Sequence, residues 1–448
     1  MLNPFEHQTV TTKFILDNPR CLITSDPGSG KTRSVIDAFN QPFRKNKKLL
    51  VLAPLSILEA SWGDDIKKFA PELTYAFAYA KDRHSAFTAD VDIVITNHDA
   101  VKWLDKNQHF LADFSMVCID EFTAFKNKDS QRSKAALRIV KHFDQRVAMS
   151  GTPNSNSILD IWHPTLLIDD GARLGIRFYS FREAVCTSTY NGFGNMWTEK
   201  DTAQETVASA IGDINIRFEL EECLDMPDHS ISYKYVTLPK KLMDQYTTLS
   251  EDSMLYTGQS TINAINAGVL VRKLLQLCTG SVYNAEGKAE TFHKARYELV
   301  MDLVNERKHS VVAFNWRHER DQLIKLAEAQ KVSYEVIDGD TPGERRTDIV
   351  QRFQAGQITV LFCHPQSAGH GLTLTKANTT IWCSPTYNAE HFQQFNRRIY
   401  RAGQTQKTET ILIAAKDTWE TDVYKKLENK LSKMEELLTV LLKIRKAA

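Results

Sequence analysis

The chain of 448 residues lacks an excess of either charge, any C-x-x-C pair and any long apolar run. Its 56 basic and 55 acidic residues give a formal net charge of +1, so any surface for nucleic acid must be a local patch. Four of the seven cysteines lie in apolar runs, which indicates small buried residues rather than disulfides or zinc ligands: Cys21, Cys118, Cys363 and Cys383. The sequence has no signal-like leader and no apolar run of about 18 residues, which predicts a soluble, intracellular, cytoplasmic protein without membrane contact.

A glycine-rich segment is present instead, in the stretch CLITSDPGSGKTRSVI at residues 21–36. Gly30, Lys31 and Thr32 fit the end of the phosphate-loop pattern G-x-x-x-x-G-K-[ST], while Ser25 stands where the first glycine is expected. A β-prone apolar run precedes the loop and apolar residues recur at helical spacing behind it, which is the context the motif requires. Gly28 and Gly30 would let backbone N–H groups face phosphates. Lys31 would reach the β- and γ-phosphates, and the Thr32 hydroxyl would ligate Mg²⁺. The alternative is a plain glycine turn before a helix.

A pair of carboxylates, Asp120 and Glu121, ends the apolar segment MVCIDE. Adjacent strand residues point in opposite directions, so the pair would diverge unless the chain turns there. A turn would let Asp120 face the metal and Glu121 the attacking water. The alternative is an ordinary solvated strand end.

Strand-like segments fall into two groups, which predicts an α/β fold with two parallel-sheet lobes in tandem. The boundaries expected are a first lobe at 1–155, a helical insertion at 156–225, a second lobe at 226–430 with a helical insertion at about 241–285, and a C-terminal amphipathic helix at 431–448. The apolar stripe of that last helix comprises Leu427, Leu431, Met434, Leu438, Leu441 and Ile444. We expect the stripe to pack back on the two lobes of this chain; the alternative is a coiled coil with a protein partner.

These motifs resemble those of the Swi/Snf-type ATPases, the chromatin-remodeller branch of the superfamily-two helicases, in a minimal phage- or prokaryote-like form. LNPFEHQ is similar to the family's adenine-reading motif, SDPGSGKT to its phosphate loop, and DEFTAFKN to its Asp-Glu-x-His box. MSGTPNSNSILDIW resembles the coupling motif, and LAPLSI and ITNHD stand where first-lobe DNA contacts stand. In the second lobe, VVAFNW, VIDGDTPGERRTDIVQRF, SAGHGLTL and FNRRIYRAGQTQ resemble the later motifs, and DTWETDVYKKL the helix that follows them. The family's loop needs no first glycine.

The resemblance implies two RecA-like lobes with helical insertions, and it implies the following site residues. Catalytic residues would be Lys31, Glu121, Arg398 and Arg401. ATP would be held by Gln8, Asp26, Pro27, Gly28, Ser29, Gly30, Lys31, Thr32 and Gly371, and Mg²⁺ by Thr32 and Asp120. DNA contacts would be Ser56, Asn97, His98, Lys126, Asn127, Asn315, Trp316, Ser367 and Gly369. Three positions depart from the family pattern: Thr123 replaces the histidine of the box, Ala368 a glycine and Thr373 an asparagine.

The function expected from this resemblance is an ATPase that moves along double-stranded DNA without separating the strands. One alternative is a strand-separating DNA or RNA helicase of another superfamily-two branch. Another is a non-enzymatic regulator that keeps the fold, which the presence of Lys31, Glu121, Arg398 and Arg401 disfavours. The implied cofactors are ATP and Mg²⁺, the implied partner is nucleic acid, and the implied location in a cell is the nucleoid.

Overall fold

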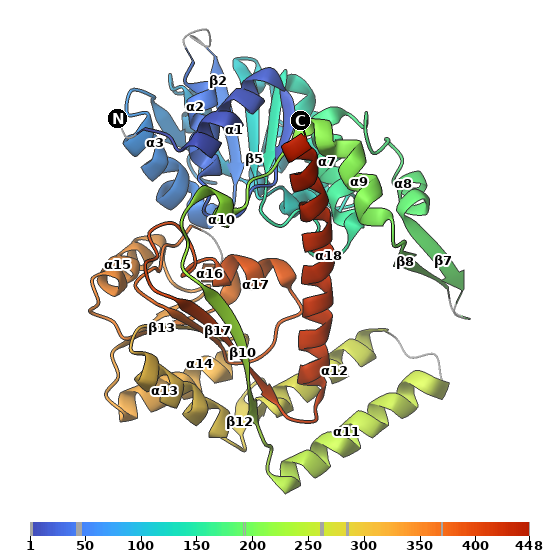
Figure 1. The fold of residues 1–448 in the computed structure, drawn as a ribbon, viewed down its shortest axis with the longest axis vertical. Helices are drawn as coiled ribbons and strands as arrows, with labels where there is room; N and C mark the ends of the chain where they lie inside the picture. The colour runs from blue at the N-terminus through green and yellow to red at the C-terminus, as the bar shows by residue number, and fades with distance from the viewer. Residues whose placement is uncertain are drawn as a thin grey trace. The chain divides into compact units, whose positions relative to one another are not determined.

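The computed structural model describes residues 3–41, 47–190, 192, 194–259, 264–283, 286–368 and 371–447. The chain divides into two compact units (Figure 1). The first unit comprises Met1–Met226 together with Lys430–Ala448, and the second comprises Pro227–Asn429. Among the described residues, no helix combines the length and the hydrophobicity that crossing a bilayer requires.

The first unit is built on a seven-stranded parallel sheet with the strand order β3-β4-β2-β5-β6-β1-β9. Its strands are β1 (Arg20–Ile23), β2 (Lys48–Ala53), β3 (Tyr75–Phe77), β4 (Ile93–Asn97), β5 (Phe114–Asp120), β6 (Gln145–Met149) and β9 (Asn215–Ile216). Its helices include α1 (Glu6–Asp17), α2 (Lys31–Phe39), α3 (Asp64–Phe69), α4 (Arg83–Thr88), α5 (Val101–Leu104), α6 (Gln131–Ile139), α7 (Trp162–Asp169), α8 (Phe178–Val185), α9 (Ala203–Ile211) and α10 (Leu220–Cys223). The short elements η2 (Leu55–Ile57), η4 (His98–Ala100) and η6 (Phe122–Phe125) follow strands β2, β4 and β5.

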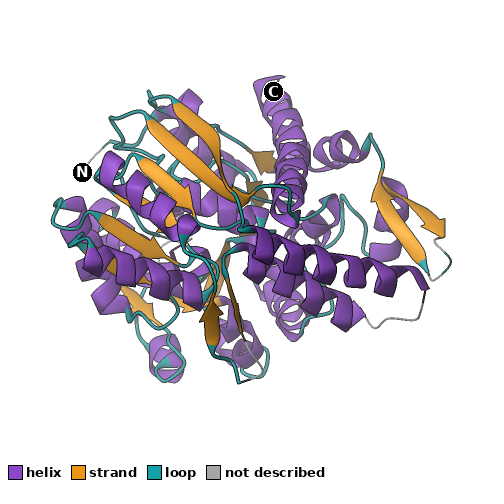
Figure 2. Ribbon diagram, turned by 90° about the horizontal axis from the view of Figure 1, so that it is seen from below, coloured by secondary structure: helices purple, strands orange, loops and turns teal. Residues whose placement is uncertain are grey.

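Strand β2 shows why this sheet is covered on both faces. Successive strand residues point to opposite faces, and in β2 both sets are apolar and buried. Leu50 and Leu52 join one hydrophobic cluster, while Leu49 and Val51 join another. The near-continuous apolar runs of the sequence are therefore those of a parallel sheet between two layers of helices (Figure 2).

The segment 156–225 is more than the helical insertion that we expected. Strands β7 (Cys186–Tyr190) and β8 (Asn195–Glu199) form an antiparallel hairpin that projects from the helices of this unit in both ribbon views (Figures 1 and 2). Strand β9 joins the main sheet beside β1. The physical reason is local: CTSTY and NMWTE are rich in Thr, Tyr and Trp and flank a glycine-bearing turn, a pattern typical of a hairpin.

The second unit has a six-stranded parallel sheet with the order β10-β17-β16-β13-β15-β14. Its strands are β10 (His229–Val236), β13 (Ser310–Ala313), β14 (Tyr334–Ile337), β15 (Val360–Cys363), β16 (Thr379–Trp382) and β17 (Thr408–Ala415). Its helices are α11 (Lys240–Gln259), α12 (Ala264–Cys278), α13 (Ala295–Arg307), α14 (Arg317–Ala329), α15 (Gly343–Gln354), α16 (Pro365–Ala368) and α17 (Ala389–Asn396), with a small hairpin of β11 (Ser281–Tyr283) and β12 (Ala289–Thr291). Two RecA-like parallel-sheet lobes in tandem, with helical insertions, are thus confirmed as the fold class.

The last helix, α18 (Trp419–Ala447), belongs to both units. Its residues up to Asn429 are part of the second unit, and those from Lys430 are part of the first. Most of its apolar stripe is buried, since Leu427, Met434, Leu438 and Leu441 are at most 4% exposed. Leu441 joins a core cluster of the first unit together with Leu437, which lies outside the stripe, and Ile444 packs against that cluster. The prediction that the stripe packs back on the chain is confirmed. Since these side chains are used internally, the alternative of a coiled coil with a partner has no support.

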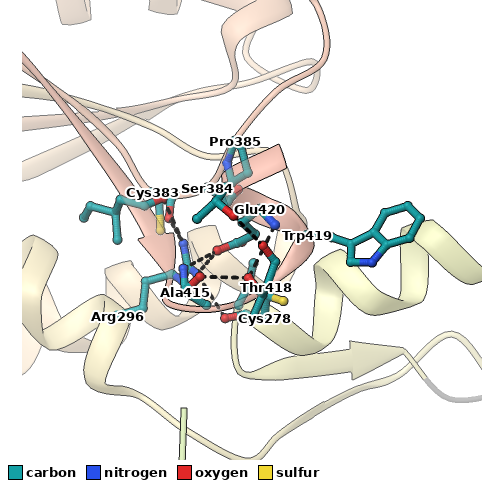
Figure 3. A network of polar contacts seen from close by, with 12 residues as sticks. Cys278, Arg296, Cys383, Ser384, Pro385, Ala415, Thr418, Trp419 and Glu420 are labelled. Atoms are coloured by element: carbon teal, nitrogen blue, oxygen red, sulfur yellow. Dashed lines mark hydrogen bonds and ion pairs between the residues drawn. The ribbon is translucent and has the colours of Figure 1, made fainter. Parts of the chain in front are cut away.

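The beginning of α18 is fixed in the second unit by a buried ion pair (Figure 3). The Arg296 guanidinium lies 2.5 Å from the Glu420 carboxylate, and the two side chains are 2% and 0% exposed. Arg296 also donates to the carbonyl oxygens of Cys383 and Cys278, at 2.6 Å and 3.0 Å, and Glu420 accepts from the N–H of Ala415 at 2.6 Å. A buried pair is tolerated only when its remaining hydrogen-bonding groups find such partners. Glu420 therefore serves as an anchor between α18, α13 and the end of β17.

Candidate active site

The phosphate loop connects β1 to α2, as the sequence predicted. Gly28 and Gly30 adopt φ angles of 90° and 79°, a left-handed conformation that glycine reaches without steric cost. A Cβ atom on Gly30 would lie 2.1 Å from Nε2 of Gln8, so the approach of α1 to the loop also requires glycine. Gln8 itself donates to the Ser29 carbonyl at 3.4 Å. The motif's second glycine is thus needed both for the turn and for the packing of Gln8.

Ser25, which replaces the motif's first glycine, has a structural partner. Its hydroxyl accepts a hydrogen bond from the N–H of Phe218 at 3.0 Å, and the N–H of Asp26 donates to the Phe218 carbonyl at 3.0 Å. Arg217 adds an ion pair with Asp26 at 3.0 Å and donates to the carbonyl of Thr24 at 2.7 Å. The segment after β9 therefore braces the loop, and the serine contributes a bond that glycine would lack.

Lys31 begins α2 and turns back over the loop. Its Nζ donates to the carbonyl oxygens of Ser25 and Asp26, at 2.8 Å and 3.0 Å. Burial lowers the pKa of the ammonium group, and the neighbouring carboxylates of Glu121 and Asp120 oppose this effect. An ammonium group held against backbone carbonyls can transfer its hydrogen bonds to the oxygens of an entering phosphate.

Asp120 and Glu121 diverge because the chain turns between them, as predicted. Glu121 adopts φ 52° and ψ 61°, a left-handed conformation that is uncommon for any residue other than glycine. Ser150 donates to Oε2 of Glu121 at 2.9 Å, and Trp62 donates to Oδ2 of Asp120 at 2.9 Å. Non-glycine residues in this conformation cluster at functional sites, where the surroundings hold them in place.

The donor set suits a magnesium ion that is bound together with nucleotide. Burial, followed by the charge of Glu121, raises the pKa of Asp120 to about 7, while the hydrogen bond from Trp62 and the charge of Lys31 oppose this effect. No group of three or more His, Cys, Asp or Glu side chains with metal-site geometry occurs in the described part of the chain. Mg²⁺ commonly uses one or two protein oxygens plus phosphates, which Asp120 and Thr32 can supply.

In the second unit, Arg398 and Arg401 converge on one backbone segment. Both donate to the carbonyl of Leu372, at 3.3 Å and 2.9 Å, and the N–H of Leu374 donates back to the carbonyl of Arg398 at 2.9 Å. Gly371, at the start of this segment, has φ 72°. The structure therefore brings together the three second-unit residues that the family motifs suggested for the nucleotide.

The DNA-contact candidates of the first unit differ in their surroundings. Ser56 lies in η2, Asn97 ends β4 and accepts from Arg83 at 2.9 Å, and Asn127 is exposed. Lys126 donates to Ser155 at 3.2 Å. His98 is buried, since its ring bonds the carbonyl of Asp120 at 2.7 Å and packs edge-on against Phe125. His98 thus supports the end of β5, and the expectation that it touches DNA directly gains no support.

Two of the four candidates of the second unit line a hollow of about 280 Å³. Asn315 and Ser367 line it, together with Arg317 and Arg320. The Asn315 amide donates to the carbonyl of Ser384 at 3.0 Å, which fixes it at the end of β13. Trp316 is adjacent and half-buried, with the Arg272 guanidinium over its ring. Gly369 lies outside the described residues.

Three supporting residues were missed from the sequence: Trp62, Ser150 and Arg217. Ser150 lies in the quoted motif MSGTPNSNSILDIW, so its contact with Glu121 could have been expected from that motif. Trp62 and Arg217 lie in no motif, and Arg217 falls in the segment that we expected to be an insertion. The contacts of these two residues depend on tertiary packing, for which the sequence carries no local signal.

This fold and this site define a helicase-like ATPase with two RecA-like lobes. The family description "SNF2-related domain" matches residues 8–172, and "Helicase conserved C-terminal domain" matches residues 295–403, together more than half of the chain. The chain belongs to the Swi/Snf-type, SNF2-related ATPases.

The chain is also similar to individual proteins. The chain is 26% identical to protein p41 of Acyrthosiphon pisum secondary endosymbiont phage 1, over 97% of each chain. It is 23% identical to a Drosophila melanogaster SWI/SNF-related, matrix-associated, actin-dependent regulator of chromatin (subfamily A-like protein 1), covering 96% of this chain and 55% of that protein. The chain thus spans about half the length of that cellular relative. A solved structure, the Sulfolobus solfataricus SWI2/SNF2 ATPase core in complex with dsDNA, aligns over 97% of this chain and 93% of its own, with 21% identity and a TM-score of 0.46.

Proposed function

We propose that this chain is an ATP-driven translocase on double-stranded DNA. The observation that carries the proposal is that the two units hold complementary parts of one ATPase. The first presents a phosphate loop with Lys31, Asp120 and Glu121, and the second holds Arg398 and Arg401 on one backbone segment.

Each part has a defined chemical task in this proposal. The loop's N–H groups and Lys31 bind the phosphates, and Glu121, held by Ser150, positions and deprotonates the attacking water. Mg²⁺, when bound, neutralises charge on the phosphate oxygens. Arg398 and Arg401 stabilise the charge that develops on the γ-phosphate, in the manner of an arginine finger. Because the arginines belong to a different unit from the loop, hydrolysis requires the units to close on ATP and open afterwards.

Binding to the DNA backbone converts this cycle into movement. Hydroxyl and amide groups at Ser56, Asn127, Asn315 and Ser367 suit phosphate oxygens, and such contacts do not depend on base sequence. The chromatin-regulator name of the Drosophila relative supports duplex DNA as the track.

Strand separation remains the alternative function, and two observations bear on it. All residues from Gly371 to Arg398 are described, and they form β16 and α17 with no hairpin that could serve as a wedge. The β7–β8 hairpin, in contrast, carries the exposed side chains of Tyr190 and Met196, which favours the helicase alternative.

The proposal predicts that duplex DNA stimulates ATP hydrolysis more than single-stranded DNA of the same length, whatever its sequence. Backbone binding releases counterions, so the duplex concentration for half-maximal stimulation should rise at least about tenfold between about 50 and 200 mM salt. Steady-state ATPase assays with no DNA, single strands and duplex measure both effects. Stimulation by single strands alone would contradict the proposal.

A further inference from the structure

Helix α8 carries an arginine that the motifs of the sequence do not include. The Arg182 guanidinium stacks on the ring of Trp197 in β8, at 3.8 Å from the centroid. The ring of Tyr179, one turn earlier on α8, lies 5.2 Å from the same guanidinium. Among the described residues, no group accepts a hydrogen bond from Arg182 or forms an ion pair with it, and its buried Nε has no partner.

An arginine in these surroundings is suited to bind an anion. Stacking uses only the faces of the guanidinium, so the N–H groups at its edge remain available in a fixed plane. That plane matches two oxygens of a phosphate. Arg173, on the loop before α8, is instead satisfied within the chain, because it pairs with Asp213 at 2.6 Å. We therefore looked for an anionic ligand that the surroundings of Arg182 would accept.

The surface around Arg182 continues to the motif DEFTAFKN. Lys128 directly follows the two DNA-contact candidates of that motif. Its Nζ lies 5.5 Å from the centroid of the Tyr179 ring and pairs with Asp129 at 2.7 Å. Tyr179, which is 61% exposed, thus contacts Lys128 as well as Arg182. A row of basic and aromatic side chains leads from the motif to the hairpin.

One face of the β7–β8 hairpin extends this row. Residues directly opposite each other in an antiparallel pair share a face, and the register pairs Ser188 with Trp197 and Tyr190 with Asn195. Ser188 and Tyr190 are two positions apart, so both pairs lie on the same face. Arg182 stacks on Trp197 there, and Ser188, Tyr190 and Asn195 are exposed. The face therefore offers hydroxyl and amide groups beside a guanidinium, which are typical phosphate ligands.

The charges around this face also favour an anion. Residues 186–198 include no charged side chain. Glu199, at the base of β8, is used internally, since it accepts from the N–H of Ile158 at 2.9 Å and pairs with Lys433 at 3.0 Å. Glu183 follows Arg182 on α8, and adjacent residues of a helix do not share a face. An anion on the hairpin face thus meets no carboxylate of the hairpin strands that lacks a partner.

We propose that α8 and this hairpin face form a second binding surface for the phosphate backbone of duplex DNA, with Arg182 as its central phosphate ligand. The inference rests on the proposed function as a duplex translocase, and it adds a contact surface that lies outside every motif of the sequence. Guanidinium, hydroxyl and amide groups bind phosphate without reading bases. The exposed hairpin then contacts an intact duplex instead of separating its strands.

The first test places one negative charge on either face of β7. Ser188 and Thr189 are adjacent and exposed, but Thr189 pairs with Met196 and so lies on the opposite face. In the full-length chain, Ser188→Glu should raise the Kd for a blunt duplex about tenfold, and Thr189→Glu should change it by less than about twofold. Fluorescence anisotropy of a labelled duplex measures the Kd, and circular dichroism checks that both variants fold alike.

The second test concerns Arg182 itself. If it binds a phosphate, Arg182→Gln should lower the slope of log Kd against log salt concentration by about one, because one fewer counterion is released. The loss of a purely structural stack would leave this slope unchanged. Arg138→Gln is the matched control, since Arg138 is an arginine of the same unit that already pairs with Asp105.

Several results would overturn the inference. One is unchanged duplex binding by Ser188→Glu, or equal weakening by both glutamate variants. Another is an unchanged salt slope in Arg182→Gln. Weakening confined to single-stranded DNA would make the surface a site for single strands, and a dimer that dissociates in Ser188→Glu would make it a contact between copies of the chain. A wild-type chain that binds no DNA would refute the proposed function, and the inference with it.

Discussion

Replacing Lys31 by alanine abolishes ATP turnover and leaves the chain folded, according to the geometry of the loop. Lys31 contacts only loop carbonyls among the hydrogen bonds that the structure defines for it, so its loss removes phosphate binding rather than core packing. Steady-state hydrolysis and nucleotide binding measure the effect, and circular dichroism measures the fold. Lys13→Ala is the matched control, since Lys13 is an exposed lysine on α1 of the same unit. Turnover in the Lys31 variant at the wild-type rate would refute the site.

Glu121→Gln separates binding from chemistry within this prediction. Glutamine keeps a carbonyl oxygen that can accept the Ser150 hydrogen bond, but it has lost the carboxylate that takes the water proton. Binding of ATP should persist, while kcat falls by about 10²–10⁴, the usual contribution of a general base. Loss of ATP binding in this variant would assign Glu121 to the nucleotide and not to the water.

Replacing Arg401 by alanine lowers kcat by about 10² or more, with a much smaller change in ATP affinity, if Arg401 stabilises the transition state. Arg401 belongs to the second unit, and its guanidinium donates to the carbonyl of Leu372 in that unit at 2.9 Å. It therefore contributes little to ground-state binding by the first unit. Single-turnover hydrolysis and equilibrium binding of ATP separate the two quantities.

Arg397→Ala is the matched control for this variant. Arg397 belongs to the same motif, FNRRIYRAGQTQ, with its guanidinium over the Tyr400 ring, but the resemblance gives it no catalytic role. Arg401→Lys adds a second comparison, because lysine keeps the charge and loses the planar fork of donors. An equal fall in kcat in the Arg397 and Arg401 variants would indicate general damage to the second unit and would contradict a specific role of Arg401.

The sequence predicted the parts of this molecule that are local in the chain. The strands and the loop at Gly28 and Gly30 follow from apolar runs and glycine positions, and the turn at Glu121 follows from the need to separate two adjacent carboxylates. These features could be predicted because the residues that cause each of them lie within a few positions of it in the sequence.

The contacts that join distant segments could not be predicted in this way. Arg217 bonds Asp26 and Arg445 bonds the Arg217 carbonyl, so the loop is braced by residues about 190 and 420 positions away. Ser25 is a further example, because the hydroxyl that distinguishes it from glycine accepts a hydrogen bond from Phe218, which is far away in the sequence. Motif position alone likewise did not reveal that the His98 ring is buried against the carbonyl of Asp120.

The most direct test of the central claim is a comparison of two DNA substrates in the presence of ATP. One is a triplex, in which a third strand lies on an intact duplex, and the other is a plain fork with two single-stranded arms. A duplex translocase displaces the third strand and leaves the fork paired, whereas the Lys31→Ala variant leaves both substrates intact. Efficient separation of the fork would contradict the account and would make the β7–β8 hairpin, with Tyr190 and Met196 at its surface, the first element to mutate.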